Sequence, residues 1–135
     1  MVHVFAPVVL ALAAANPRVS SLPIVEALHL LGQSAPTAPI TLIHPRAEKG
    51  FAGARTDAAY TDGRTIWLNA YLTDPRKIAA ILAHEQWHIL HGPAEPPAYA
   101  EQARVLRNFG LDKEAHRIEK VAQVVTRRST TPLER

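Results

Sequence analysis

The pattern of apolar and polar positions is most informative in one long segment, TDPRKIAAILAHEQWHILHG. A helix formed by this segment would be apolar on nearly every side, which is typical of a central, buried helix. Thr73 or Asp74 can cap its start, and Pro75 suits its first turn. Gly92 suits its end. The pattern therefore predicts a central helix over residues 75–91.

Further segments on both sides of this helix show helical periodicity. Pro17, Gly32 and Gly110 interrupt them, as helix breakers do. The last segment begins at Asp112, which can cap it, and it carries one apolar stripe. We expect helices at 6–15, 22–31, 98–109 and from Asp112 to Arg127, the last with Leu111, Ala115, Ile118, Ala122 and Val125 in its stripe.

Three extended runs predict a small sheet. PITLIH, at residues 39–44, alternates and is rich in β-branched side chains. The run 50–60 and the run RTIWLN flank Asp62 and Gly63, and Asp-Gly between two extended runs is a strong hairpin signal. We therefore expect a short antiparallel sheet with residues 65–69 as an edge strand.

The length of the chain limits the architecture. Its 135 residues suffice for one domain with a modest core. We expect a single α+β domain over residues 1–135, in which the small sheet packs on the central helix and further helices flank it. The chain has no cysteine, which excludes disulfides and thiolate metal sites.

Charge and the start of the chain bear on its partners. The net charge of +3 arises in the C-terminal third and is mild for a nucleic-acid-binding protein. The apolar run MVHVFAPVVLALAAANP has no preceding Lys or Arg, is interrupted by Pro7 and is too short to span a bilayer. We expect no membrane partner and a cytoplasmic protein, or a secreted one if residues 1–15 are a signal peptide.

The central helix carries three ionisable groups in the string HEQWH. A spacing of four places His84 and His88 on one face of the helix. Burying such groups without partners costs several kcal/mol, and a Zn²⁺ ion bound by both imidazoles would remove that cost. Glu85 could then take a proton from a water molecule activated by the metal. The alternative is a pair of core histidines held by hydrogen bonds alone.

A catalytic zinc ion keeps three protein ligands, so a third ligand must come from elsewhere. His91 lies about 10 Å along the helix axis from His84, too far to share one ion, and is expected outside the coordination sphere. Glu95 and Glu101 are the candidates for the third ligand. Tyr99 could donate a hydrogen bond to a developing oxyanion or pack against the metal-binding helix.

HEQWH followed by EPPA resembles the gluzincin zinc metallopeptidases, including their minimal members. IWLN and HEQWHILH particularly resemble the ImmA/IrrE-type metallopeptidases, and the resemblance covers residues 64–106. It implies a zincin-like fold with His84 and His88 as ligands, Glu85 as the general base and Glu95 as the third ligand. The chain departs from the family pattern in its short spacing before EPPA and in the Tyr that follows this string.

These features together predict a zinc metallopeptidase that acts on a peptide or protein substrate. Strand 65–69 would hold the substrate in an extended conformation by strand addition. Two alternatives remain open at this stage. One is a non-catalytic zinc-binding interaction module, and the other, less favoured, is a basic nucleic-acid-binding domain that uses residues 104–128.

Overall fold

The computed structural model describes residues 22–43 and 58–130, with the side chains of 128–130 excepted. The predicted helix 6–15, the question of a signal peptide in 1–15 and most of the predicted strand 50–60 lie outside these residues. Along the chain, the elements are α2 (Leu22–Leu30), β1 (Ile40–Ile43), β2 (Ala59–Thr61), β3 (Ile66–Asn69), α3 (Pro75–His91), α4 (Glu95–Asn108) and α5 (Asp112–Thr130).

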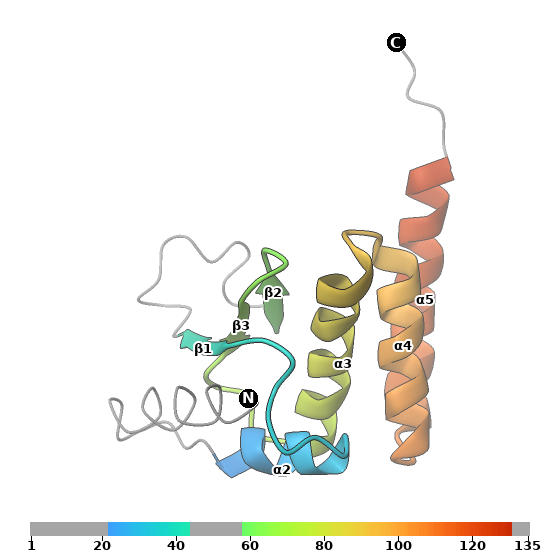
Figure 1. Cartoon of the computed structure of the whole chain (residues 1–135). Helices are drawn as coiled ribbons and strands as arrows, with labels where there is room; N and C mark the ends of the chain where they lie inside the picture. The colour runs from blue at the N-terminus through green and yellow to red at the C-terminus, as the bar shows by residue number, and fades with distance from the viewer. Residues whose placement is uncertain (1–21, 44–57, 131–135) are drawn as a thin grey trace.

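The described elements form an α+β structure in which α3 is central, as predicted. Figure 1 shows α3 between the small sheet on one side and the pair α4 and α5 on the other. Helix α2 also packs against α3. Within the described ranges, no helix is both long and apolar enough to cross a lipid bilayer.

The sheet is mixed, so the prediction of an antiparallel sheet is wrong for one of its strands. Its strand order is β1-β3-β2. Strands β2 and β3 form the antiparallel hairpin predicted around Asp62 and Gly63, but β1 pairs with β3 in parallel, with Ile40 opposite Ile66. A hairpin signal fixes only the two strands that it joins, whereas a parallel partner arrives through a longer connection that leaves no local signal.

Strand β3 is the central strand, so the prediction that 65–69 forms an edge strand is also wrong. Ile66 and Leu68 of β3 are fully buried, whereas every residue of β2 is half-buried. In the strand order β1-β3-β2, strand β3 has a hydrogen-bonded neighbour on each side, whereas β2 has only one. Among the described residues, β2 therefore forms the edge of the sheet next to α3.

The core lies on both sides of α3. One cluster joins the sheet to α2 and α3, and its largest fully buried side chains are Ile40, Ile66, Leu68, Ile78 and Leu82. A second cluster joins α3 to α4 and α5 through small and branched side chains, namely Ala80, Ala83, Ala103, Val105, Leu106 and Ala115. Burial on two opposite sides explains why the sequence of α3 is apolar nearly all round.

The ends of α3 are those that the sequence predicts. Asp74 is the N-cap, and its side chain accepts a hydrogen bond from the backbone N–H of Arg76 at 3.0 Å. Pro75 is the first helical residue, where its missing N–H costs nothing because that position has no intrahelical partner. Gly92 ends the helix with a φ of 104°.

Helices α4 and α5 differ slightly from the prediction. Helix α4 begins at Glu95 rather than at residue 98, because Pro96 and Pro97 fit its first turn instead of preceding it. Helix α5 continues to Thr130, beyond the expected end at Arg127. Its predicted stripe is confirmed, since Ala115 is buried and the other four members are partly buried.

Replacing the α3 cap should destabilise the fold measurably. Asp74→Ala removes the side-chain acceptor for the Arg76 N–H, and we expect it to lower the free energy of unfolding by about 1 kcal/mol in equilibrium urea denaturation. The control is Arg76→Ala, which removes only an exposed ion pair with Asp74 and should cost less than about 0.5 kcal/mol. Equal effects of the two variants would contradict a capping role.

Candidate metal centre

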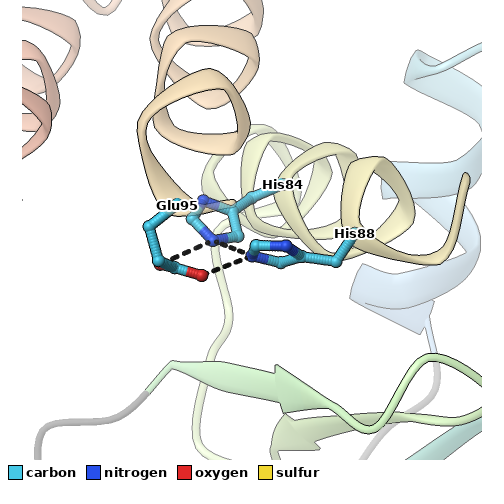
Figure 2. Close-up of side chains that lie close together, drawn as sticks. All are labelled: His84, His88 and Glu95. Atoms are coloured by element: carbon cyan, nitrogen blue, oxygen red, sulfur yellow. Dashed lines mark hydrogen bonds and ion pairs between the residues drawn. The ribbon is translucent and has the colours of Figure 1, made fainter. Parts of the chain in front are cut away.

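Two helices bring the predicted ligands together. His84 and His88 lie one turn apart on α3, with side chains only 8% and 10% exposed. The short turn after Gly92 reverses the chain, so that Glu95, the first residue of α4, returns against the same face of α3. Figure 2 shows the two imidazoles and the Glu95 carboxylate pointing toward one another from these two helices.

The distances within this group suit a single metal ion. Nε2 of His84 and Nε2 of His88 are 3.2 Å apart. Oε1 of Glu95 lies 2.5 Å from Nε2 of His88, and Oε2 of Glu95 lies 3.5 Å from Nε2 of His84. Ligand atoms that each lie about 2.0–2.2 Å from one zinc ion are no more than about 4 Å apart. His84, His88 and Glu95 therefore form a group that could hold a metal ion.

A backbone contact orients the His88 ring. Nδ1 of His88 lies 2.9 Å from the carbonyl oxygen of Gly92. A carbonyl only accepts, so Nδ1 carries the proton and donates it to this bond. The lone pair of the neutral ring is then on Nε2, which faces His84 and Glu95. Such an outer hydrogen bond is the usual way in which a protein fixes a metal-binding histidine.

His84 is held by packing rather than by a comparable hydrogen bond. Its Nδ1 is buried and has no partner at full hydrogen-bonding geometry in the described structure. The edge of the Tyr99 ring packs against it, with ring centroids 4.5 Å apart at 71°. Burial lowers the pKa of His84, although the charge of Glu95 acts in the opposite direction. The neutral imidazole, which is the form that binds metal, is thus favoured.

Glu85 lies next to the metal group without belonging to it. Its side chain is buried, and burial raises its pKa to about 7, with the His88 charge opposing the rise and the Glu95 charge adding to it. Glu85 lines the same cavity as His84 and His88. Glu85 therefore belongs to the site but is not one of the three residues whose side chains converge on one point.

The structure separates the other candidates from the group. Glu101 pairs with Arg104 on the exposed side of α4, with 2.9 Å between Arg104 Nε and Glu101 Oε2, and is not among the three converging residues. His91 is exposed and packs on the Trp87 ring, with centroids 4.8 Å apart, and it is not among the three converging residues. For Tyr99 the packing alternative is confirmed, and the oxyanion role stays a prediction.

The group opens onto a cavity of about 750 Å³. The hairpin residues 58–63 line one side of it, and Ile118 and Val121 of α5 line another. Sequence reasoning missed these walls. The signal that could have found the α5 wall is Val121, an apolar residue that lies off the stripe among charged neighbours.

No protein-family model matches this chain, and no curated protein and no solved structure matches it either. What the sequence and structure define together is a candidate metal centre of two imidazoles and one carboxylate.

The ligand set can be tested by metal content. We expect about one divalent ion per chain by elemental mass spectrometry after zinc is added and excess removed. His84→Ala, His88→Ala or Glu95→Ala should each reduce this content strongly, because each removes one of the converging donor atoms. Glu101→Ala and His91→Ala are the controls and should retain the ion. Loss in Glu101→Ala equal to that in Glu95→Ala would contradict the assignment.

Gly92 should matter to the metal as well as to the fold. Its φ of 104° and ψ of −166° lie in a region that is nearly exclusive to glycine, although a Cβ there would meet no other atom within 4 Å. Gly92→Ala should cost about 1–3 kcal/mol of stability and, by moving the carbonyl that holds His88, weaken metal binding about tenfold or more.

The matched control is Gly110→Ala, which changes another glycine with a positive φ, of 76°, away from the metal group. It should cost about 1 kcal/mol of stability and leave metal affinity unchanged, as measured by competition with a zinc chelator. The same metal affinity in both variants would rule out the orienting role of Gly92.

Proposed function

We propose that the protein is a zinc-dependent hydrolase of the gluzincin type that cleaves peptide bonds. The observation that carries the proposal is the convergence of His84, His88 and Glu95 on one point, with Glu85 on the wall of the same open cavity. A site of purely structural hydrogen bonds would need neither a third ionisable group at this point nor a cavity beside it.

Zinc is the ion that this donor set favours. Two imidazoles and one carboxylate form one of the recurrent three-ligand sets of catalytic zinc, in which a fourth position stays open. When bound, the ion would polarise the scissile carbonyl and acidify the attacking water molecule. The contribution of the chain is to favour the neutral form of His84 through burial and to orient the His88 ring through the Gly92 carbonyl.

Glu85 is the proposed general base. It would take a proton from the attacking water and then pass it to the nitrogen of the leaving amine, so that no proton is lost or gained over the reaction. Its position supports this role, because it follows His84 directly on α3 and faces the cavity rather than the ligand point. Tyr99, which lines the same cavity, is the proposed donor to the oxyanion.

The substrate would lie along β2 and not along the strand first expected. In the described structure β2 pairs with β3 on one side only, and residues 58–63 line the cavity beside the metal group. An extended peptide can add to such an edge through backbone hydrogen bonds. This arrangement would carry the scissile bond past Glu85 and the ligand point.

Glu85→Gln tests the mechanism. The variant should bind as much zinc as the native protein and lose at least about 100-fold in kcat/KM on a peptide mixture followed by mass spectrometry, because it lacks a proton acceptor. His91→Gln is the control on the same helix, since His91 is exposed and lies outside the group, and it should keep full activity.

Full activity in Glu85→Gln would overturn the mechanism. Zinc binding with no cleavage of any peptide by the native chain would instead favour a non-catalytic zinc-binding interaction module. Among the described side chains of residues 104–127, Arg104, Arg107 and Arg117 each pair with a carboxylate, which does not favour a nucleic-acid-binding surface.

A further inference from the structure

A pair of glutamine side chains connects α3 to the segment between α2 and β1. Nε2 of Gln33 donates to Oε1 of Gln86 at 2.9 Å, and Nε2 of Gln86 donates to Oε1 of Gln33, also at 2.9 Å. The two bonds close a ring in which each amide is both donor and acceptor for the other. Gln86 is only 6% exposed. Neither glutamine lines the cavity or belongs to the metal group, so the proposed reaction leaves this pair unexplained.

Stability alone is a weak reason for a buried amide pair. The core cluster shared by α2, the sheet and α3 consists of aliphatic side chains. Replacing both partners of a buried hydrogen bond by apolar groups of the same shape is often neutral or stabilising. What an amide pair adds is direction, because its bonds hold only within a narrow range of distances and angles. The pair is therefore better explained by the orientation that it imposes than by stability.

Gln86 is placed to control the rotation of α3 about its own axis. Successive residues of an α-helix are turned by about 100°, so Gln86 points about 160° away from both His84 and His88. The third member of the metal group, Glu95, belongs to α4 and does not turn with α3. A rotation of α3 that breaks the amide pair therefore also turns both imidazoles away from the Glu95 carboxylate.

The opposite side of α3 restrains this rotation less. Among the described residues, the buried side chains that α3 contributes to the cluster with α4 and α5 are Ala80 and Ala83. Alanine side chains form low ridges, which set the distance between packed helices more than the rotation of either one. A directional contact elsewhere on α3 is therefore needed to fix its rotation.

Gln33 provides a fixed point for such a contact. It follows Gly32, whose φ of 71° ends α2, and its backbone N–H donates to the carbonyl oxygen of Leu28 at 2.9 Å. The N–H of Gly32 donates to the carbonyl oxygen of His29, which completes the hydrogen-bonded ending typical of a glycine-terminated helix. The chain then passes beside α3 on its way to β1 (Figure 1). Gln33 is thus held by the backbone of α2.

We propose that Gln33 and Gln86 are positioning residues of the metal centre, and that their amide pair holds α3 in the rotation at which His84 and His88 face Glu95. The inference rests on the metal centre of the proposed function. It goes beyond that function because it gives a role to two residues outside both the ligand group and the cavity. Loss of the pair should then affect metal affinity and fold stability differently.

The test replaces both glutamines by methionine, which is unbranched and nearly as long. Gln33→Met/Gln86→Met leaves no polar group unpaired, so the metal-free full-length variant should unfold in urea at the native midpoint or above it. Its zinc affinity, measured by competition with a chelator, should fall about tenfold or more, because the imidazoles are no longer held in place. Cobalt(II) bound in place of zinc should show altered visible absorption bands, since these bands depend on the geometry of the ligands.

Two further variants separate positioning from stability. Gln33→Met alone leaves Gln86 buried without its partner, so it should lower both the unfolding midpoint and the zinc affinity. The second methionine should then restore the midpoint but not the affinity. Gln33→Leu/Gln86→Leu repeats the double replacement with branched side chains, so that the comparison does not depend on how one pair of residues packs.

Ile78→Val is the matched control on the same helix. Ile78 is 1% exposed and belongs to the cluster shared by α2, the sheet and α3. The shorter side chain loses packing without removing either amide, so this variant should lower the unfolding midpoint and keep the native zinc affinity and cobalt(II) spectrum.

The outcomes distinguish this inference from the function on which it rests. If the native chain binds neither zinc nor cobalt(II), the metal centre is overturned, and the proposed function and the positioning role with it. If the native chain binds zinc and both double variants bind it equally well with an unchanged cobalt(II) spectrum, the positioning role alone is overturned. It is also overturned if zinc affinity simply follows the unfolding midpoint in every variant, Ile78→Val included.

Discussion

Two imidazoles buried on an otherwise apolar helix are the constraint on which the rest of this structure depends. Helix α3 packs against the sheet on one side and against α4 and α5 on the other. Nε2 of His84 and Nε2 of His88 face each other and the Glu95 carboxylate at 2.5–3.5 Å. Several acceptor atoms that close to one another need a proton or a cation between them. Because other elements pack around α3, the two imidazoles lie on the side of this helix that faces the cavity.

The turn at Gly92 both orients His88 and brings Glu95 to the two histidines. Gly92 ends α3, its carbonyl holds Nδ1 of His88, and its backbone conformation sends the chain back toward α3. Glu95 then begins α4, where the partial positive charge of a helix N-terminus favours an acidic side chain. The two prolines that follow suit a first turn because they lack the N–H that would be unpaired there. Local chemistry alone thus brings the third group to the histidines.

The parts of the molecule that depend on neighbours in sequence were predictable, and those that depend on distant neighbours were not. The caps of α3, the Asp62-Gly63 hairpin and the stripe of α5 each have a signal within a few residues, and each is present in the structure. The parallel pairing of β1 and the central place of β3 have no such signal, because they arise from contacts across a long connection.

The same division holds for the site. The spacing of His84 and His88 is visible in the sequence, whereas the choice between Glu95 and Glu101 needed the direction of each side chain, and Glu101 is taken up by Arg104. Spacing along a helix does not report what approaches from another element. For this reason the α5 wall of the cavity, at Ile118 and Val121, had no counterpart in the sequence pattern beyond one valine among charged residues.

The short link between α3 and α4 has a consequence for how the molecule assembles. All the converging groups lie between residues 84 and 95, so bringing them together closes only a very short loop. Loop-closure entropy and folding rates both favour such local contacts over pairings between distant segments. The metal group can therefore form in a helical hairpin before β1 reaches β3, and two walls of the cavity, those from β2 and α5, lie outside this hairpin. The metal-binding residues and these two cavity walls consequently lie on separate parts of the chain. Substitutions in the walls can therefore alter which molecules the cavity accepts without changing the metal-binding residues.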